Sequence, residues 1–221
     1  MLNQNPKELL LSTACFPPIE YMVHILKSDT IFIEKEETYP KQTWRNRYAI
    51  MSANGILHLS IAVKKPYGNK TKTGQVLLDN TSKWQVKQWR AIESAYRNAP
   101  FFIYYKDLIK EFFIENQKET LLIEWNTEIL KSILNEFGID KKINYTEEFV
   151  LYPEDKTDLR YSISPKNKNY TIKSFSEYIQ VFSYKYGFIK NLSIIDLIFN
   201  IGPEVPEYLS NQASEISQPS K

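Results

Sequence analysis

The sequence predicts one α/β domain over residues 1–209, with a mixed sheet, a parallel β-α-β core and flanking helices. Two short apolar runs typical of buried strands, 9–16 and 30–34, enclose a segment whose apolar residues recur at helical spacing. A strand, a helix and a strand within roughly 25 residues indicate a parallel crossover. The pair Asn54-Gly55 between two further apolar stretches adds an antiparallel hairpin.

Each element has its own signal along the chain. Pro17-Pro18 opens the first helix, and Met22, Val23 and Leu26 form its apolar stripe. The hairpin strands are expected at 48–51 and 57–63, and further helices at 82–99, 101–116, 120–137 and 191–200, with a short helix after Gly202-Pro203. Residues 143–152 are expected to be extended, 155–169 to form a loop, 175–182 to form a helix or a strand, and 210–221 to be a disordered tail.

The composition excludes several classes of protein. The net charge of the 221 residues is +2 with acids and bases interspersed, which argues against a nucleic-acid binder but allows a small phosphorylated substrate. A single cysteine excludes an intrachain disulfide and fits a reducing cytoplasm. The N-terminus lacks the features of a signal peptide, and no apolar run reaches the roughly 18 residues of a membrane span. The two histidines are far apart, so no metal site is predicted, and the oligomeric state is not indicated.

The basic segment 41–47 is the first candidate site. Ligands of open parallel sheets bind beyond the carboxyl ends of the strands, and this segment follows the strand 30–34. The guanidiniums of Arg45 and Arg47 suit a phosphate or carboxylate, with Asn46 between them to orient an acceptor. Surface ion pairs with Glu34, Glu36 or Glu37 are the alternative explanation.

The second candidate lies on the apolar segment 191–200. Its polar residues Ser193, Asp196 and Asn200 are spaced by three and four, so they share one stripe of a helix that is otherwise apolar and therefore buried. Such a stripe needs hydrogen-bond partners or a ligand. Asp196 is therefore expected to face the arginines as a counter-ion or general base, unless Ser193 simply caps the helix and Asp196 serves its first turn.

The candidate site residues come from these two segments and from three positions outside them, Tyr39, Tyr178 and Gln180. The catalytic candidates are Asp196 and Asn46. The substrate-binding candidates are Arg45, Arg47, Gln42, Trp44, Tyr39, Tyr178, Gln180, Asn191, Ser193 and Asn200.

Other groups have weaker signals. Cys15 lies between a strand and a turn, but no histidine motif supports it as a nucleophile, and free cysteine is commonly buried and inert. Glu20 and His24 are four residues apart, as in a hydrolytic pair, although a solvated helix face explains them better. No Walker loop, GxGxxG or nucleophile elbow occurs, so the cofactor is unknown.

Several blocks together resemble the WbqC-like protein family. They are Ser12–Tyr21, Gln42–Arg47, Asn54-Gly55, Trp84 with Ala91–Tyr96, Ala99–Phe102, Asp158–Arg160 with Pro165-Lys166, Tyr178–Phe182, and Asn191–Asn200 with Gly202-Pro203. The resemblance implies a bacterial, cytoplasmic protein of O-antigen or surface-polysaccharide synthesis. Many members carry a His-Gln-Pro motif on the first strand, where this chain has Ser12-Thr13-Ala14.

The function expected from the resemblance is transfer of an acyl or aminoacyl group, for which glycine has been suggested, to a nucleotide-linked amino sugar. In this scheme Arg45 and Arg47 hold the phosphate or carboxylate, and Tyr39, Trp44 and Tyr178 stack on a base or sugar. A nucleotidyl transferase or nucleotide-binding ligase is the first alternative. A non-catalytic module of a polysaccharide-synthesis complex is the second.

Overall fold

The computed structural model describes residues 7–114, 119–167 and 169–216. Its strands are β1 (Glu8–Ser12), β2 (Thr30–Glu34), β3 (Arg47–Ser52), β4 (Gly55–Ser60), β5 (Val63–Lys64), β6 (Leu77–Leu78), β7 (Lys142–Tyr145) and β8 (Thr157–Asp158). Its helices are α1 (Ile19–Lys27), α2 (Trp84–Tyr96), α3 (Phe102–Lys110), α4 (Leu122–Glu136), α5 (Ser183–Tyr186), α6 (Ile194–Ile201) and α7 (Val205–Ala213).

The main sheet has four strands in the order β7-β2-β1-β8, and all of its pairs are parallel. β1 and β2 pair along their whole length, with Leu9 opposite Ile31 and Leu11 opposite Ile33. These four side chains lie on one face of the sheet and are buried, and Leu10 on the opposite face is buried as well. Because α1 connects β1 to β2, the predicted β-α-β crossover is confirmed.

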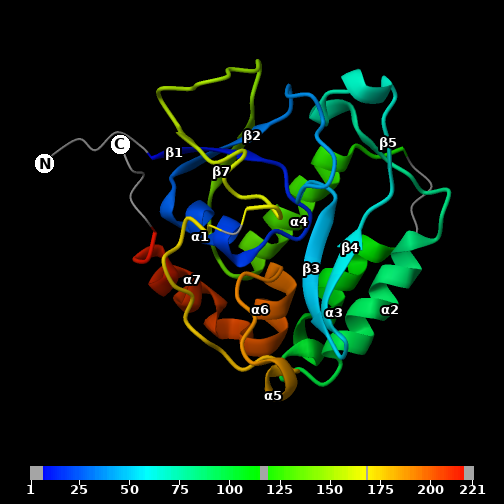
Figure 1. Cartoon of the computed structure of the whole chain (residues 1–221), viewed down its shortest axis with the longest axis vertical. Helices are drawn as coiled ribbons and strands as arrows, with labels where there is room; N and C mark the ends of the chain where they lie inside the picture. Colours follow the sequence, from blue (N-terminus) through cyan, green and yellow to red (C-terminus); the bar gives the residue numbers. More distant parts are fainter. Residues whose placement is uncertain (1–6, 115–118, 168, 217–221) are drawn as a thin grey trace, which may run out of the picture.

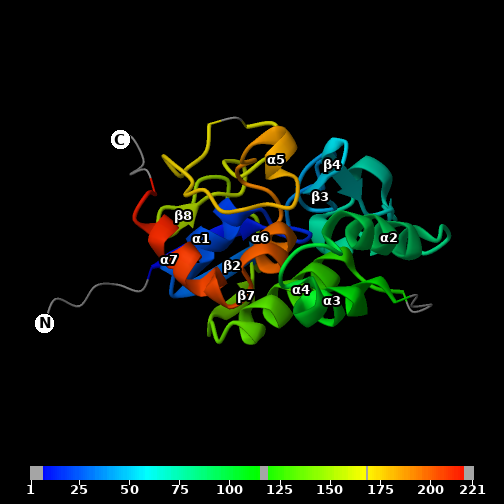
Figure 2. The ribbon, with the colours of Figure 1, turned by 90° about the horizontal axis from the view of Figure 1, so that it is seen from below.

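Helices flank the sheet. On one side α1 packs against α7 and α6, and these helices lie together below the strands in Figure 1 and in front of them in Figure 2. The other half of the molecule contains the β3–β4 hairpin with α2 and α3 (Figure 1). α4 lies centrally against the parallel sheet, where Asn126 bonds to Thr13 and Thr127 bonds to Tyr145 of β7. α6 contacts α1, α3 and β3, so it joins the two halves around a common hydrophobic core. The predicted α/β class with a parallel core and flanking helices is confirmed. The predicted mixed sheet is wrong, because within the described ranges the antiparallel hairpin strands pair only with each other and the four-stranded sheet is all parallel.

The β3–β4 hairpin forms where the Asn-Gly pair predicted it. Gly55 has φ of +100°, in the left-handed region that glycine occupies without strain. The strands pair antiparallel from Arg47 opposite Ser60 to Ser52 opposite Gly55. They form a separate two-stranded sheet beside the parallel one. β3 is buried from Tyr48 to Met51 because α2 and α6 pack against it.

Three other segments differ from expectation. The aromatic segment 101–116 forms α3 and a 3-10 turn at Glu111–Phe113, and its last two residues lie outside the described range. Extended structure near 143–152 is limited to β7, because residues 149–152 stay exposed in spite of their apolar side chains and are not part of a strand. The segment 175–182 forms neither a helix nor a strand.

The C-terminal segment also differs, because α7 continues to Ala213 and Ile216 forms a β-bridge with Ile172. The sequence after residue 209 is polar, yet Gln212 is buried and α7 packs against α1. Tertiary contacts therefore extend a helix that local composition did not favour. Residues 217–221 lie outside the described part of the chain.

Gly202, at the end of α6, has no room for a side chain. Its φ is +52°, and a Cβ built there would lie 2.5 Å from Cδ1 and Cγ of Phe101. We expect Gly202→Ala to lower the free energy of unfolding by about 2–3 kcal/mol, since it adds overpacking to left-handed strain. Chemical denaturation measures the loss.

Gly187→Ala is the matched control, because Gly187 has φ of +69° but nothing within 4 Å of a built Cβ. It isolates the backbone strain, so its expected cost is about 1 kcal/mol. If both variants lost the same free energy of unfolding, the clash with Phe101 would contribute nothing to the cost of Gly202→Ala.

Candidate functional site

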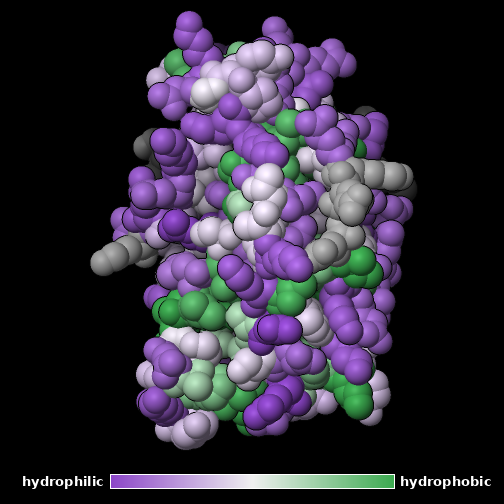
Figure 3. Space-filling view, turned by 90° about the vertical axis from the view of Figure 1, so that its right-hand side faces the viewer, coloured by the Kyte–Doolittle hydropathy of each residue, from purple (hydrophilic) through white to green (hydrophobic). Residues whose placement is uncertain are grey.

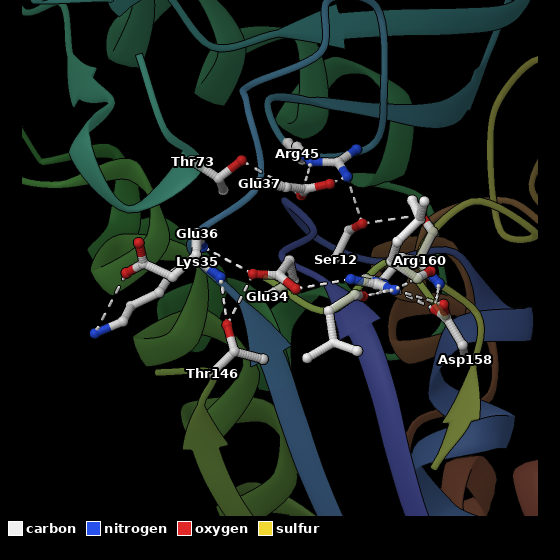
Figure 4. Close-up of polar contacts among 12 residues, drawn as sticks. Ser12, Glu34, Lys35, Glu36, Glu37, Arg45, Thr73, Thr146, Asp158 and Arg160 are labelled. Carbon is white, nitrogen blue, oxygen red and sulfur yellow. Dashed lines mark hydrogen bonds and ion pairs between the residues drawn. The ribbon is translucent and has the colours of Figure 1, made fainter. Parts of the chain in front are cut away.

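A network of buried charged side chains occupies the carboxyl edge of the parallel sheet. β1, β2 and β8 end there in Ser12, Glu34 and Asp158, because parallel strands bring their carboxyl ends together. Figure 4 shows these residues converging on two arginines that follow the strands, Arg45 and Arg160. Both arginines are buried. Burial of so many charges requires that each has partners.

Arg160 joins two strands and a loop. Its Nη1 donates to Oε2 of Glu34 at 2.8 Å, and its Nε and Nη2 donate to Asp158 at 3.0 and 2.7 Å. Nη2 also donates to the carbonyl oxygen of Val150 at 2.8 Å, which ties the loop after β7 to this edge. Glu34 is held from its other side by Oγ1 of Thr146 at 2.8 Å. Each nitrogen of the Arg160 guanidinium therefore has at least one partner within the protein.

One guanidinium nitrogen of Arg45 makes no hydrogen bond to the described residues. Its Nε and Nη2 donate to Oε1 of Glu37 at 2.9 and 2.6 Å, and Nη2 also donates to Oγ of Ser12. The ion-pair alternative named Glu37 correctly, although this pair is buried rather than on the surface. Within the described part of the chain, Nη1 of Arg45 makes no hydrogen bond. Burial raises the pKa of Glu37, and Arg45 only partly offsets this effect.

A small hollow opens beside Arg45 at the end of β1. Its free volume is about 10 Å³, room for about one water molecule. The lining residues are Ser12, Thr13, Ala14, Tyr21, Trp44, Arg45, Leu159, Arg160 and Ile163. The hollow therefore lies where ligands of parallel sheets bind, with a guanidinium in its wall.

Several buried polar atoms near Arg45 also have no hydrogen-bond partner in the described part. They are Oε2 of Glu37, the Tyr39 hydroxyl, Oγ1 of Thr43 and Oδ1 of Asn126. Asn126 is nonetheless anchored, because its Nδ2 donates to Oγ1 of Thr13 at 3.0 Å and to the carbonyl oxygen of Arg45 at 2.8 Å. Native proteins satisfy most such groups, so their concentration in and against the segment 37–45 is typical of a functional site.

The other candidates in the basic segment have different surroundings. Asn46 donates from Nδ2 to the carbonyl oxygen of Ile61 at 2.9 Å, so its amide holds the backbone. Arg47 opens β3, is partly exposed and donates from Nε to Oγ of Ser60 at 3.3 Å. Gln42 is exposed, with φ of +58°. Trp44 lines the hollow and stacks on His58, with ring centroids 6.5 Å apart.

Asp196, which is fully buried, lies at the centre of a second network. Its Oδ1 accepts from the Tyr96 hydroxyl at 2.7 Å, and its Oδ2 accepts from the Tyr178 hydroxyl at 2.6 Å and Nε2 of Gln180 at 2.8 Å. Asn200 donates from Nδ2 to the backbone oxygen of Asp196 at 2.7 Å. Burial raises the pKa of Asp196, and the donated hydrogen bonds counteract this in part.

The two remaining candidates hold helix ends. Ser193 caps α6, since its Oγ accepts from the backbone N–H of Ile195, as the capping alternative predicted. Asn191 accepts from the backbone N–H of Glu20 at 2.9 Å through Oδ1, at the start of α1. Its φ of +56° is one that asparagine tolerates.

The structure does not bring Arg45 and Asp196 together. The side chain of Arg45 bonds to Glu37 and Ser12. The side chain of Asp196 bonds to residues of α2 and of the segment 178–180. No described residue bonds to both side chains. Tyr178 and Gln180 donate hydrogen bonds to Asp196, whereas Trp44 lines the hollow beside Arg45. The expected common hollow is therefore replaced by two separate networks.

Glu20 and His24 are buried, so the expected solvated helix face is wrong. The segment after residue 169 covers them: Oγ1 of Thr171 bonds to Oε1 of Glu20 at 2.7 Å and to Nε2 of His24 at 2.6 Å. Burial, assisted by the charge of Lys27, lowers the pKa of His24 to about 4, which keeps the imidazole neutral at pH 7. Cys15 is also buried, and burial raises the pKa of its thiol, so it is an unsuitable nucleophile.

Arg160 and Asn126 were not among the predicted site residues, although Arg160 belongs to a block that resembles the family. Arg160 follows β8, which is two residues long and offers no apolar run from which a strand could be predicted. Asn126 is a single amide on the buried face of α4. A polar residue at an apolar position of a helix is the signal that indicates it.

The described residues contain no group of three or more histidine, cysteine or acidic side chains that could hold a metal ion. Among the helices within the described ranges, none has the length and apolar character needed to cross a bilayer.

Comparison with known proteins identifies the family. The model of the WbqC-like protein family matches residues 13–172, well over half of the chain. The chain belongs to the WbqC-like protein family. An uncharacterized protein, Rv1507c of Mycobacterium tuberculosis (strain ATCC 25618 / H37Rv), is 26% identical to this WbqC-like protein over 208 residues, 82% of this chain and 87% of the relative. No solved structure matches the chain significantly.

The family match covers the two networks of this WbqC-like protein to different extents. Arg45, Glu37, Asn126 and Arg160 fall inside the matched residues and Ser12 lies just before them, whereas of the Asp196 network only Tyr96 falls inside. The family model therefore covers most of the carboxyl edge of the sheet.

Proposed function

We propose that this WbqC-like protein is a transferase of bacterial O-antigen or other surface-polysaccharide synthesis. It transfers an acyl or aminoacyl group to a nucleotide-linked amino sugar, and the anionic part of that substrate binds at the carboxyl edge of the sheet. The observation that carries the proposal is the free Nη1 of Arg45 in the wall of the hollow. Family membership supports the pathway.

Arg45 is suited to this role because Glu37 and Ser12 fix its orientation before a ligand arrives. A guanidinium in buried surroundings interacts more strongly with phosphate or carboxylate than one in water. Oε2 of Glu37 and Oδ1 of Asn126 are acceptors for N–H or O–H groups beside the anion. Asp196 and Asn46 have internal partners and take no part in this proposal.

The test is a thermal-shift screen with nucleotide-linked amino sugars and with inorganic phosphate. We expect the substrate class to raise the melting temperature of the wild type, because a ligand that binds only the folded state stabilises it. Arg45→Lys should weaken binding by roughly tenfold or more, since lysine lacks the planar fork. Each variant is compared with its own unliganded melting temperature, which removes any effect on the fold.

Arg47→Lys is the matched control, because Arg47 is two residues away but partly exposed and bonded to Ser60. It should retain the wild-type shift. A melting-temperature shift with nucleotides that carry no linked amino sugar, added to the screen, would favour the nucleotidyl transferase or ligase. The absence of any shift across the screen would favour the non-catalytic module.

A further inference from the structure

A second pocket lies at the opposite end of the molecule from the carboxyl edge. Its free volume is about 340 Å³, within the range of small-molecule sites. The lining residues are Asn98, Pro100, Ile179, Gln180, Val181, Phe182, Tyr184 and Asn200. Figure 1 shows α5 and the adjoining α6 in the lower half, away from the segments 35–46 and 146–156 in the upper half.

The lining has no acidic, basic or histidine side chain. It combines three amides with two aromatic rings and three aliphatic residues. Figure 3 shows hydrophobic residues gathered mainly in the lower half of the molecule, while the upper part is largely hydrophilic. A pocket of this composition has no group to neutralise a phosphate or carboxylate, so its ligand is uncharged.

The amides offer both donors and acceptors. Asn98 is exposed and its side chain makes no hydrogen bond within the described ranges. Asn200 is 6% exposed, and its Oδ1 is an acceptor without a donor. Gln180 is fixed as a wall of the pocket, since Nε2 donates to Asp196 and Oε1 accepts from the backbone N–H of Ile189 at 2.8 Å. Hydroxyl groups, which donate and accept at once, complement such a set.

The aromatic side adds an apolar surface. Tyr184 is 83% exposed, and its ring centroid lies 6.5 Å from that of Phe182, with the planes tilted by 46°. Ile179 beside them is 84% exposed. The face of an aromatic ring packs against an apolar C–H surface of a ligand, while the phenol hydroxyl remains available to solvent or ligand.

From these observations we infer that the pocket between α5, the end of α6 and the α2–α3 junction binds an uncharged saccharide. The sugar ring lies on the face of Tyr184, and its hydroxyls bond to Asn98 and to Oδ1 of Asn200. The site is distinct from the carboxyl edge and does not depend on the function proposed there.

The test is saturation-transfer NMR on the full chain with a panel of neutral sugars: glucose, galactose, mannose, N-acetylglucosamine and N-acetylgalactosamine. Uridine and adenosine are included as uncharged nucleosides. We expect at least one sugar to bind, with Kd of about 1 mM or below. Tyr184→Ala and Asn98→Ala should each weaken it by roughly tenfold, since both remove contacts without disturbing the core.

Tyr152→Ala is the matched control, because Tyr152 is 82% exposed but belongs to the loop after β7. It should bind the sugar as the wild type does, and inorganic phosphate should not displace the sugar from the wild type. The inference is overturned if no sugar of the panel binds, if only a nucleoside binds, or if Tyr184→Ala binds as tightly as the wild type. Displacement of the sugar by inorganic phosphate would place the sugar at the carboxyl edge and also overturn it.

Discussion

Replacement of Arg160 by methionine is expected to lower the free energy of unfolding by about 3–5 kcal/mol. The guanidinium is buried between Glu34 and Asp158 and also bonds to the backbone of the loop after β7. Methionine fills much of the volume but leaves the buried Glu34 without its cation. Urea denaturation monitored by circular dichroism measures the loss.

Two further variants test the cause of this loss. Arg47→Met removes a partly exposed guanidinium and should cost less than about 1 kcal/mol. Glu34→Gln removes the charge that Arg160 neutralises. If the cost of Arg160→Met comes from an uncompensated charge, the double variant should lose at least about 1 kcal/mol less than the sum of the single losses. Strict additivity would contradict the explanation.

Asp196→Ala is expected to cost about 3–4 kcal/mol, the second largest effect. It leaves the Tyr178 hydroxyl and Nε2 of Gln180 without the acceptor at 2.6 and 2.8 Å, and it also removes the bond from Tyr96. Each buried donor left unpaired costs about 1–3 kcal/mol. Tyr178→Phe, which removes one donor and leaves the carboxyl group, should cost about 1 kcal/mol. A loss in Asp196→Ala no larger than that of Tyr178→Phe would show that the network contributes little.

The free energy of unfolding that Asp196→Ala loses depends on pH in a defined direction. Burial raises the pKa of Asp196 above its ordinary value of 3.8, so the folded state holds the proton more tightly than the unfolded state. The stabilisation from this shift is complete below the unfolded pKa and is lost as pH rises through the folded pKa. The difference in stability between the wild type and Asp196→Ala should therefore narrow as pH rises. A difference that widens over this range would contradict the raised pKa.

The core of the fold could be predicted from local patterns. Apolar runs around an amphipathic helix predict the crossover, and Asn54-Gly55 predicts the hairpin because the turn needs a left-handed glycine. The cap of α6 at Ser193 follows from the same kind of local rule. Such features depend on residues within a few positions of one another.

The candidate site could be predicted only in part, because its contacts are distant in sequence. The pairing of Arg45 with Glu37 spans eight residues and lay within reach, whereas Arg160 reaches Glu34 across 126 residues. The burial of Glu20 depends on Thr171, 151 residues away. Spacing on one helix cannot show which distant segment covers it. The polar stripe of α6 was correctly expected to need hydrogen-bond partners. The expected partners of Asp196, the arginines, were wrong, because its partners lie on α2 and in the segment 178–180.

The order β7-β2-β1-β8 places the two strands that come earlier in the sequence inside the sheet and the two later ones at its borders. During synthesis the outer edge of β2 therefore stays unpaired until β7 has emerged, and that of β1 until β8 has emerged. Pairings between such distant segments are slow to form, because a long loop must close before the strands can make contact. The sheet should consequently be completed only after β8 has been translated, and the unpaired edges of β1 and β2 are the surfaces that a chaperone would need to shield in the meantime.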